Sequence, residues 1–174
     1  MQEKTIAAIS TAQAPGGIGI IRISGPSAIP TADRVFCSAK GNLLKNIFGY
    51  TALYGRVHDG DEDIDEAIAL VFKAPASYTG EDVVELSCHG GVYITGRVLR
   101  AVLKAGAIPA QPGEFTRRAF LNGKMGLTQA EAVMDIIKAQ GEQAARAARM
   151  LHEGALAKKI NGIKENLLSQ AAHL

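Results

Sequence analysis

The sequence contains no tryptophan, and aromatic residues make up only 5% of its 174 residues. Hydrophobic residues still reach 47%, so a core is expected, and it must be built mainly from aliphatic side chains. A charged fraction of 21% argues against disorder. The formal net charge of +2 is too small to indicate nucleic-acid binding from electrostatics. These numbers describe a near-neutral globular chain with one domain, or one domain and a helical appendage.

Cysteine is also scarce, because Cys37 and Cys88 are the only two. They lie far apart without a Cys-x-x-Cys spacing, which argues against both a disulfide framework and a structural zinc site. The first residues lack a basic segment followed by a long apolar one, so no signal peptide is expected. No apolar run approaches the ~18 residues of a membrane span. We therefore expect a cytoplasmic protein.

Hydrophobic periodicity divides the chain into two parts. Five short apolar runs predict strands, at 5–10, 18–24, 50–58, 65–72 and 83–88. Three stretches with helical spacing predict helices, at 26–36, 92–105 and 114–121. From Thr128 onward the spacing is helical, and Thr128 with Glu131 predicts a capping box at the helix start. The sequence therefore predicts an α+β domain of mixed strands and helices over 1–122, followed by a partial all-α helical domain over 123–174.

The helical part carries an apolar stripe from Ala130 to Leu151, and a second apolar pattern follows Gly154. Gly154 is expected to interrupt the helix. Two helices alone can hardly bury these stripes, so we interpret this part as a piece of a larger helical domain.

Two glycine-containing segments fail the tests for nucleotide binding. A phosphate-binding loop needs a glycine, four further residues, Gly-Lys and then Ser or Thr. Here Gly123 and Lys124 are followed by Met125, and Arg118 occupies the earlier glycine position. The segment that begins at Gly17 misses the third glycine of a dinucleotide fingerprint and opens a strand instead of a helix. The residues of this chain therefore provide no visible route to GTP hydrolysis.

The acidic run Asp59, Asp61 and Asp63 matches only the start of a calcium-binding EF-hand loop. Ile64 stands where that loop needs glycine, and Leu70 stands where it needs glutamate. We interpret the run as the solvated tip of a hairpin with a longer loop.

His89 directly follows Cys88 on a predicted strand. Neighbours on a strand point to opposite faces, so the two make a poor catalytic pair. A structural role for His89 at the strand end is favoured, while its place in a His-Gly-Gly motif keeps a functional role open.

Two charged residues stand inside apolar strands. Glu85 lies in a Val-Val-Glu-Leu run and Arg22 lies among isoleucines, and a buried charge is costly unless it is paired. One interpretation, slightly favoured by spacing alone, places both on solvated faces or pairs them with each other. The other is a polar pocket for a charged or amide-rich small molecule, because a carboxylate can accept two parallel N–H bonds. Lys124 taken alone is a surface lysine.

Three segments carry a specific pattern: GGIGIIRISG at 16–25, SYTGEDVVELSCHGG at 77–91 and PGEFTRRAFLNGKMGLTQAEAV at 112–133. Together they resemble the N-terminal part of the MnmE (TrmE) family of tRNA-modification GTPases. This resemblance implies a domain similar to the tetrahydrofolate-binding domains of aminomethyltransferases, which binds 5-formyl- or 5,10-methylene-tetrahydrofolate and forms a homodimer. Aligned on these motifs, the family's folate contacts fall on Arg22, Glu85 and Lys124. Gly126 departs from the pattern, since the family usually has Asp there.

The resemblance also implies a larger context. Family members continue into a Ras-like G domain that uses GTP, magnesium and potassium, and they end in a Cys-x-Gly-Lys tail; this chain has neither a P-loop nor that tail. With a flavoprotein of the MnmG (GidA) type, the whole protein would modify the wobble uridine of certain tRNAs. The role expected for this chain is folate binding and dimerisation, with no catalysis of its own.

Two other interpretations stay open. The chain is a protein–protein interaction module that binds no small molecule, or it is a complete aminomethyltransferase-like enzyme. The short chain and the lack of an arranged base or nucleophile rank the enzyme last.

Overall fold

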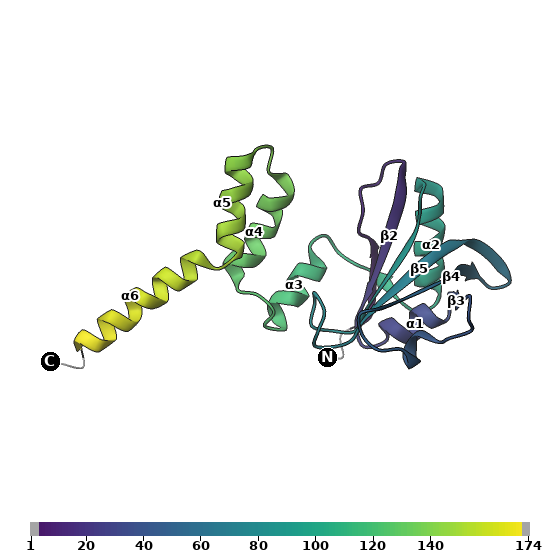
Figure 1. The fold of residues 1–174 in the computed structure, drawn as a ribbon, viewed down its shortest axis with the longest axis horizontal. Coiled ribbons are helices and arrows are strands. Elements are labelled where there is room, and N and C mark those ends of the chain that lie inside the picture. Colours follow the sequence, from purple (N-terminus) through teal and green to yellow (C-terminus); the bar gives the residue numbers. More distant parts are fainter. Residues whose placement is uncertain (1–3, 172–174) are drawn as a thin grey trace. The chain divides into compact units, whose positions relative to one another are not determined.

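The structure, a computed structural model, describes residues 4–171. The chain divides into two compact units, with the division between Arg118 and Ala119. The first unit combines strands with helices and the second is helical, so the predicted α+β class with an all-α continuation is confirmed (Figure 1). No helix within 4–171 is long and apolar enough to cross a membrane.

The first unit is built on a seven-stranded mixed sheet. Its strands are β1 (Ile6–Ile9), β2 (Gly16–Ser24), β3 (Phe36–Ser38), β4 (Thr51–Asp59), β5 (Glu62–Phe72), β6 (Val83–Gly90) and β7 (Ile108–Pro109). They lie in the order β3-β4-β5-β6-β2-β1-β7. The short β7 runs parallel to β1, and the other pairings are antiparallel. The sheet therefore places β2 and β6, which carry Arg22 and Glu85, side by side near its centre.

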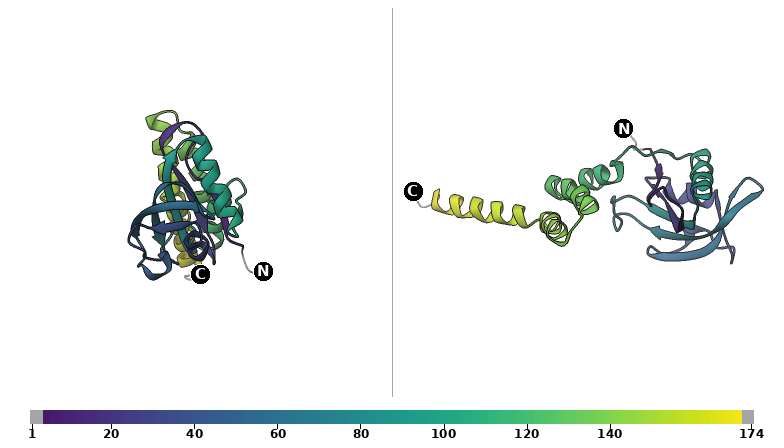
Figure 2. Two further views of the ribbon diagram at one scale, coloured as in Figure 1. Left: turned by 90° about the vertical axis from the view of Figure 1, so that its right-hand side faces the viewer. Right: turned by 90° about the horizontal axis from the view of Figure 1, so that it is seen from above.

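Helices α1 (Ala28–Asp33) and α2 (Val92–Lys104) cover one face of this sheet (Figures 1 and 2). The core between them is aliphatic, as the composition predicts, and its fully buried members include Ile21, Ile23, Val84, Leu86, Val98 and Val102. Side chains alternate along a strand. The residues between these core positions therefore point to the opposite face of the sheet, and Arg22 and Glu85 are among them.

The five strands predicted for the first unit are all present, but one local expectation was wrong and two short strands were missed. The hairpin of β4 and β5 does not have a long acidic loop, because β5 already begins at Glu62 and His58 pairs with Asp63. Gly60 has φ +64°, which suits a tight connection. Strands β3 and β7 were not predicted, since runs of three and two residues are too short to show a periodic pattern.

The second unit contains α4 (Leu127–Lys138), α5 (Glu142–His152) and α6 (Ala155–Ala171), and the division falls inside α3 (Glu114–Leu121). The apolar stripe is not carried by one continuous helix. Ala139 leaves the helical conformation with φ −60° and ψ 123°, and α5 then packs beside α4. Gly154, with φ +76°, does end α5 as predicted. Ile137 remains 70% exposed, so this unit leaves apolar side chains uncovered.

The predicted capping box of Thr128 and Glu131 was wrong. Helix α4 begins at Leu127, and its N-cap is Gly126, two residues before the predicted cap. The amide N–H of Gly126 donates to Oε1 of Gln129 at 2.8 Å. Gln129 therefore supplies the reciprocal bond that the prediction had assigned to Glu131.

Candidate functional site

Arg22 on β2 and Glu85 on β6 are direct partners in the antiparallel ladder. Nε of Arg22 donates to Oε1 of Glu85 at 2.8 Å, and Nη2 lies 2.7 Å from the same oxygen. The two side chains are only 26% and 17% exposed, so each offsets part of the cost of removing the other from water. The structure therefore brings together two of the three predicted site residues, and it pairs them.

Arg22 and Glu85 each have polar atoms that take no part in the bonds between them. Among residues 4–171, the structure shows no hydrogen bond to Oε2 of Glu85 or from Nη1 of Arg22. Glu85 therefore keeps one hydrogen-bond acceptor, and Arg22 keeps one donor group, outside the bond between them. Such groups can accept from an N–H and donate to an oxygen of a bound molecule.

Two aromatic rings contact the guanidinium of Arg22. Its Cζ lies 5.4 Å from the ring centroid of Tyr78 and 5.5 Å from that of Phe115. Tyr78 belongs to the loop between β5 and β6, and Phe115 belongs to α3. The hydroxyls of Tyr78 and Thr116 are hydrogen-bonded at 2.9 Å. Sequence reasoning missed these rings as site residues; their place in the SYTG and PGEF segments was the available signal.

A second cluster of charges fixes α3 against the same loop. Arg118 is 4% exposed, and its Nη1 donates to both carboxylate oxygens of Glu81, at 3.0 and 3.2 Å. Its Nη2 donates to Oε1 of Glu114 and to the carbonyl of Lys4, both at 2.9 Å. Glu81 also accepts a bond from the hydroxyl of Ser24 at 2.7 Å. The arginine that replaces the first P-loop glycine therefore has a structural role.

Lys124 belongs to the second unit, in the turn after α3, and its side chain is exposed. Gly123 has φ +70°, and its N–H donates to the carbonyl of Phe120 at 3.0 Å. The N–H of Lys124 donates to the carbonyl of Ala119 at 2.8 Å. These two bonds form a Schellman motif that ends α3. Lys124 is thus held by its backbone, in a different unit from Arg22 and Glu85.

His89 and Cys88 point to opposite faces of β6, as predicted. Asp65 on β5 accepts the backbone N–H of His89 with Oδ2 and contacts its Nδ1 with Oδ1, both at 2.8 Å. This hydrogen bond and the charge of Asp65 raise the pKa of His89 above its usual range. Cys88 is buried, and burial raises the pKa of its thiol to about 11. The pairing with Asp65 joins β5 and β6, which fits a structural role for His89.

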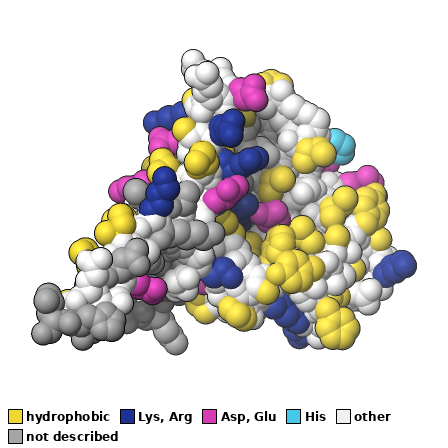
Figure 3. Space-filling model, turned by 60° about the vertical axis from the view of Figure 1, so that its left-hand side comes forward, with side chains coloured by type: hydrophobic (Ala, Val, Ile, Leu, Met, Phe, Trp, Pro, Cys, Tyr) yellow, Lys and Arg dark blue, Asp and Glu magenta, His cyan; other side chains and the backbone are white. Residues whose placement is uncertain are grey.

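The sheet face opposite α1 and α2 carries a row of large side chains. The strand registers align Tyr54, Ile68, Ser87 and Ile20 across β4, β5, β6 and β2. Tyr54 and Ile68 are 56% and 48% exposed, and Ile18, two residues before Ile20 on β2, is 67% exposed. We call the surface formed by Ile18, Ile20, Tyr54 and Ile68 the open face. In Figure 3, hydrophobic side chains gather on one face of the molecule beside acidic and basic ones.

The next row on the same side of the sheet contains Leu70, Glu85 and Arg22. The charged pair therefore borders the open face. A ligand bound at the pair would lie beside exposed apolar side chains, which is the usual composition of a small-molecule site.

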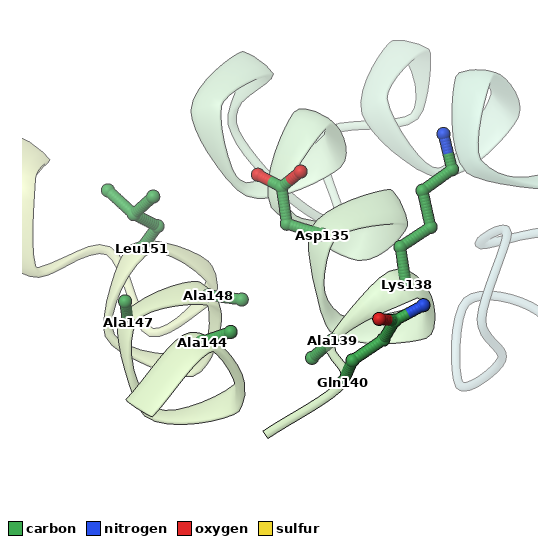
Figure 4. A pocket seen from close by; sticks show the side chains of 8 residues that line it. All are labelled: Asp135, Lys138, Ala139, Gln140, Ala144, Ala147, Ala148 and Leu151. Atoms are coloured by element: carbon green, nitrogen blue, oxygen red, sulfur yellow. The ribbon is translucent and has the colours of Figure 1, made fainter. Parts of the chain in front are cut away.

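A groove of about 480 Å³ lies between α4 and α5 in the second unit (Figure 4). Alanines, among them Ala144 and Ala148, line its α5 side, and Asp135 and Lys138 extend from α4. A small-molecule site needs several convergent polar groups, and these two side chains point away from the alanines in Figure 4. Within the described part of the chain, no group of three His, Cys, Asp or Glu side chains is placed to hold a metal ion. The groove is therefore not the candidate site.

The fold and the site define the class of protein: an α+β sheet domain that is followed by helices and carries the Arg22–Glu85 pair on the sheet face opposite α1 and α2. This class is distinct from the P-loop domains. The family model described as "GTP-binding protein TrmE N-terminus" matches residues 5–124. Because this match covers most of the chain, the chain belongs to the TrmE (MnmE) family of tRNA-modification GTPases.

Curated relatives support the same assignment over the whole chain. The chain is 52% identical over 175 residues to the "tRNA modification GTPase MnmE" of Symbiobacterium thermophilum, covering 100% of this chain and 38% of the relative. It is 49% identical over 168 residues to the protein of that name from Chlorobaculum tepidum, covering 96% and 36%. For the Bacillus subtilis protein, identity is 44% over 172 residues, covering 98% and 38%. The chain therefore spans well under half the length of these relatives and corresponds to their N-terminal part.

Proposed function

We propose that this part of the family's chain binds a reduced folate, 5-formyl- or 5,10-methylene-tetrahydrofolate, and forms a homodimer. The observation that supports folate binding most directly is the half-buried Arg22–Glu85 pair at the border of the open face. The pterin ring of a folate presents N–H donors beside a carbonyl acceptor on one edge. Glu85 supplies the acceptor and Arg22 the donor for that edge, or for a carboxylate of the glutamyl tail.

The ion pair between Arg22 and Glu85 in the ligand-free chain favours folate binding, because it orders both side chains before a ligand arrives. The guanidinium and the carboxylate are already desolvated in part and held in one geometry, so less ordering is left to the binding step. Lys124 remains the third proposed folate contact, on the strength of the family resemblance. In the longer protein, the bound folate would supply a one-carbon unit to a wobble uridine of tRNA, together with a flavoprotein of the MnmG (GidA) type. GTP hydrolysis, with magnesium and potassium, would belong to the G domain.

Folate binding is tested by titrating the chain with 5-formyltetrahydrofolate in a calorimeter. We expect a dissociation constant of ~1 µM or lower, and Glu85→Gln is expected to weaken binding by about 10- to 100-fold because a charged acceptor becomes an amide. Lys124→Ala is expected to weaken it as well. Asp61→Asn and Lys45→Ala, which change exposed charges elsewhere, are matched controls and should bind like the wild type. Absence of binding by a folded dimer would reject the folate site and favour an interaction module.

The open face supports the proposed homodimer. Exposed apolar surfaces of this kind commonly mark interfaces, and a two-fold dimer brings the same surface of two copies together. A second copy packed on the open face would cover Tyr54 and Ile68 in both chains at once.

Dimerisation is tested by analytical ultracentrifugation. The wild-type chain should sediment with about twice its mass of 18.3 kDa. Ile68→Lys places a charge on the open face of both copies and is expected to raise the dissociation constant of the dimer by about tenfold or more. Tyr93→Lys changes a residue on α2 that is 69% exposed, more than Ile68, and lies away from the open face, so it should leave the dimer intact. A monomeric wild type, or equal effects of the two substitutions, would contradict the proposed interface.

A further inference from the structure

We infer that Tyr78 and Phe115 are positioning residues for the candidate site: they hold the guanidinium of Arg22 in its ligand-binding orientation, and the bond between Tyr78 and Thr116 holds the two rings together. We call Tyr78, Phe115 and Thr116 the aromatic clamp. Because the clamp acts on Arg22, this role rests on the proposed folate function.

Arg22 needs such a constraint. An arginine side chain loses much rotamer freedom when it is fixed, and Glu85 contacts it through a single carboxylate oxygen. One oxygen restrains the guanidinium less than the two parallel bonds of a bidentate pair do. Both aromatic rings lie within 6 Å of its Cζ, the range of a cation–π contact. The rings therefore supply the restraint that the carboxylate alone does not give.

The clamp is itself anchored on both sides. Phe115 and Thr116 are consecutive residues of α3, which Arg118 ties to Glu81 of the loop. Tyr78 precedes Thr79 in that loop, and Thr79 bonds the hydroxyl of Ser24 at 2.7 Å. Ser24 lies two residues after Arg22 on β2. The three sequence segments that carry the family resemblance therefore meet around one guanidinium.

Core packing does not account for the rings. Tyr78 is 36% exposed, and neither Tyr78 nor Phe115 belongs to the hydrophobic core formed by the described residues of the first unit. Leucine would fill much of the same space without a π-face. Leucine at either position would lack the ring that contacts the charge of Arg22.

The clamp is tested by titrating 5-formyltetrahydrofolate into Tyr78→Leu, Phe115→Leu, Tyr78→Phe and the wild type. Each leucine variant is expected to bind about tenfold more weakly, because it loses one cation–π contact. Tyr78→Phe keeps the ring and loses only the bond to Thr116, so it should recover most of the affinity. Thr116→Val removes the same bond from the other side and should match Tyr78→Phe.

A double-mutant cycle separates positioning from general structure. If the ring of Tyr78 acts through Arg22, Tyr78→Leu should weaken binding in the wild-type chain but cause no further loss in Arg22→Gln. The same cycle, measured by urea unfolding without ligand, should show coupling between the two positions.

Equal losses from Tyr78→Leu in both backgrounds, or leucine variants that bind like the wild type, would overturn the clamp and leave the folate site standing. If the wild-type chain does not bind the folate, the proposed function fails instead. The unfolding cycle then decides about the clamp by itself, and additive effects there would reject it.

Discussion

Replacing Arg118 by alanine is expected to lower the free energy of unfolding by about 3–5 kcal/mol, the usual cost of breaking a buried ion pair from one side. Arg118 is buried between Glu81 and Glu114 and also donates to the carbonyl of Lys4. Without the guanidinium, two carboxylates that are each only 11% exposed lose their cation. Urea unfolding followed by circular dichroism measures the loss.

Arg117 is the matched control for this experiment. It precedes Arg118 on α3 but is exposed, so Arg117→Ala should change the unfolding free energy by less than about 0.5 kcal/mol. Similar losses for both arginines, or a loss below about 1 kcal/mol for Arg118→Ala, would show that the buried cluster does not stabilise α3.

The same variant should change the response to acid. Burial raises the pKa of Glu114, but the hydrogen bonds from the Gln111 amide and from Arg118 outweigh it, so the pKa lies below the usual 4.5. A depressed pKa contributes stability that is present above pH 4.5 and is lost as the pH falls through the folded-state value. Arg118→Ala removes one of the two lowering contacts. As the pH falls below 4.5, the free energy of unfolding of Arg118→Ala should therefore decrease less than that of the wild type.

Gly90→Ala is expected to destabilise the chain by about 3 kcal/mol, at the upper end of the usual cost of overpacking. A Cβ at this position would lie 2.6 Å from the carbonyl oxygen of Gly16 and 2.8 Å from the carbonyl group of Ile18. Both contacts are with backbone, so no side chain can rotate away. The crowding arises where β2 has an irregular register against β6, between Gly16 and Gly19.

Gly91, the second glycine of the His-Gly-Gly motif, provides the comparison. Its nearest contact to an added Cβ is Cγ1 of Ile94 at 3.8 Å, an ordinary van der Waals distance. Gly91 is also the N-cap of α2, where alanine is less favourable than glycine, so Gly91→Ala should lower the free energy of unfolding by only about 1 kcal/mol or less. Equal destabilisation by the two substitutions would mean that the approach of β2 to β6 is not what requires glycine.

The strands and the core could be predicted from the sequence because both depend on local alternation. The same alternation identified Arg22 and Glu85 as charges in apolar strands. Whether they pair could not be derived, since their contact joins residues 63 positions apart and depends on the register of β2 against β6. Tyr78 and Phe115 gave no periodic signal at all, because one lies in a loop and the other on a short helix.

The local errors have physical reasons of their own. Thr128 with Glu131 and Gly126 with Gln129 both have the spacing of a capping box, and the backbone conformation at Gly126 selects the second pair. The break after α4 was missed although Gly141, the N-cap of α5, marks it in the sequence, because Ala139 and Gln140 before it are acceptable helix residues. Packing of α5 beside α4, a tertiary effect, overrides their helical propensity.

The short strand β7 limits how copies of this chain can associate. Ile108 and Ala110 donate their N–H groups to the carbonyls of Thr5 and Ala7, and the intervening Pro109 has no N–H to offer on the outer side. An incoming strand would therefore find no donor at that position of the sheet border. The opposite border is formed by β3, which has only three residues. Both borders thus resist the addition of a further strand, which lowers the tendency of such sheets to aggregate edge to edge.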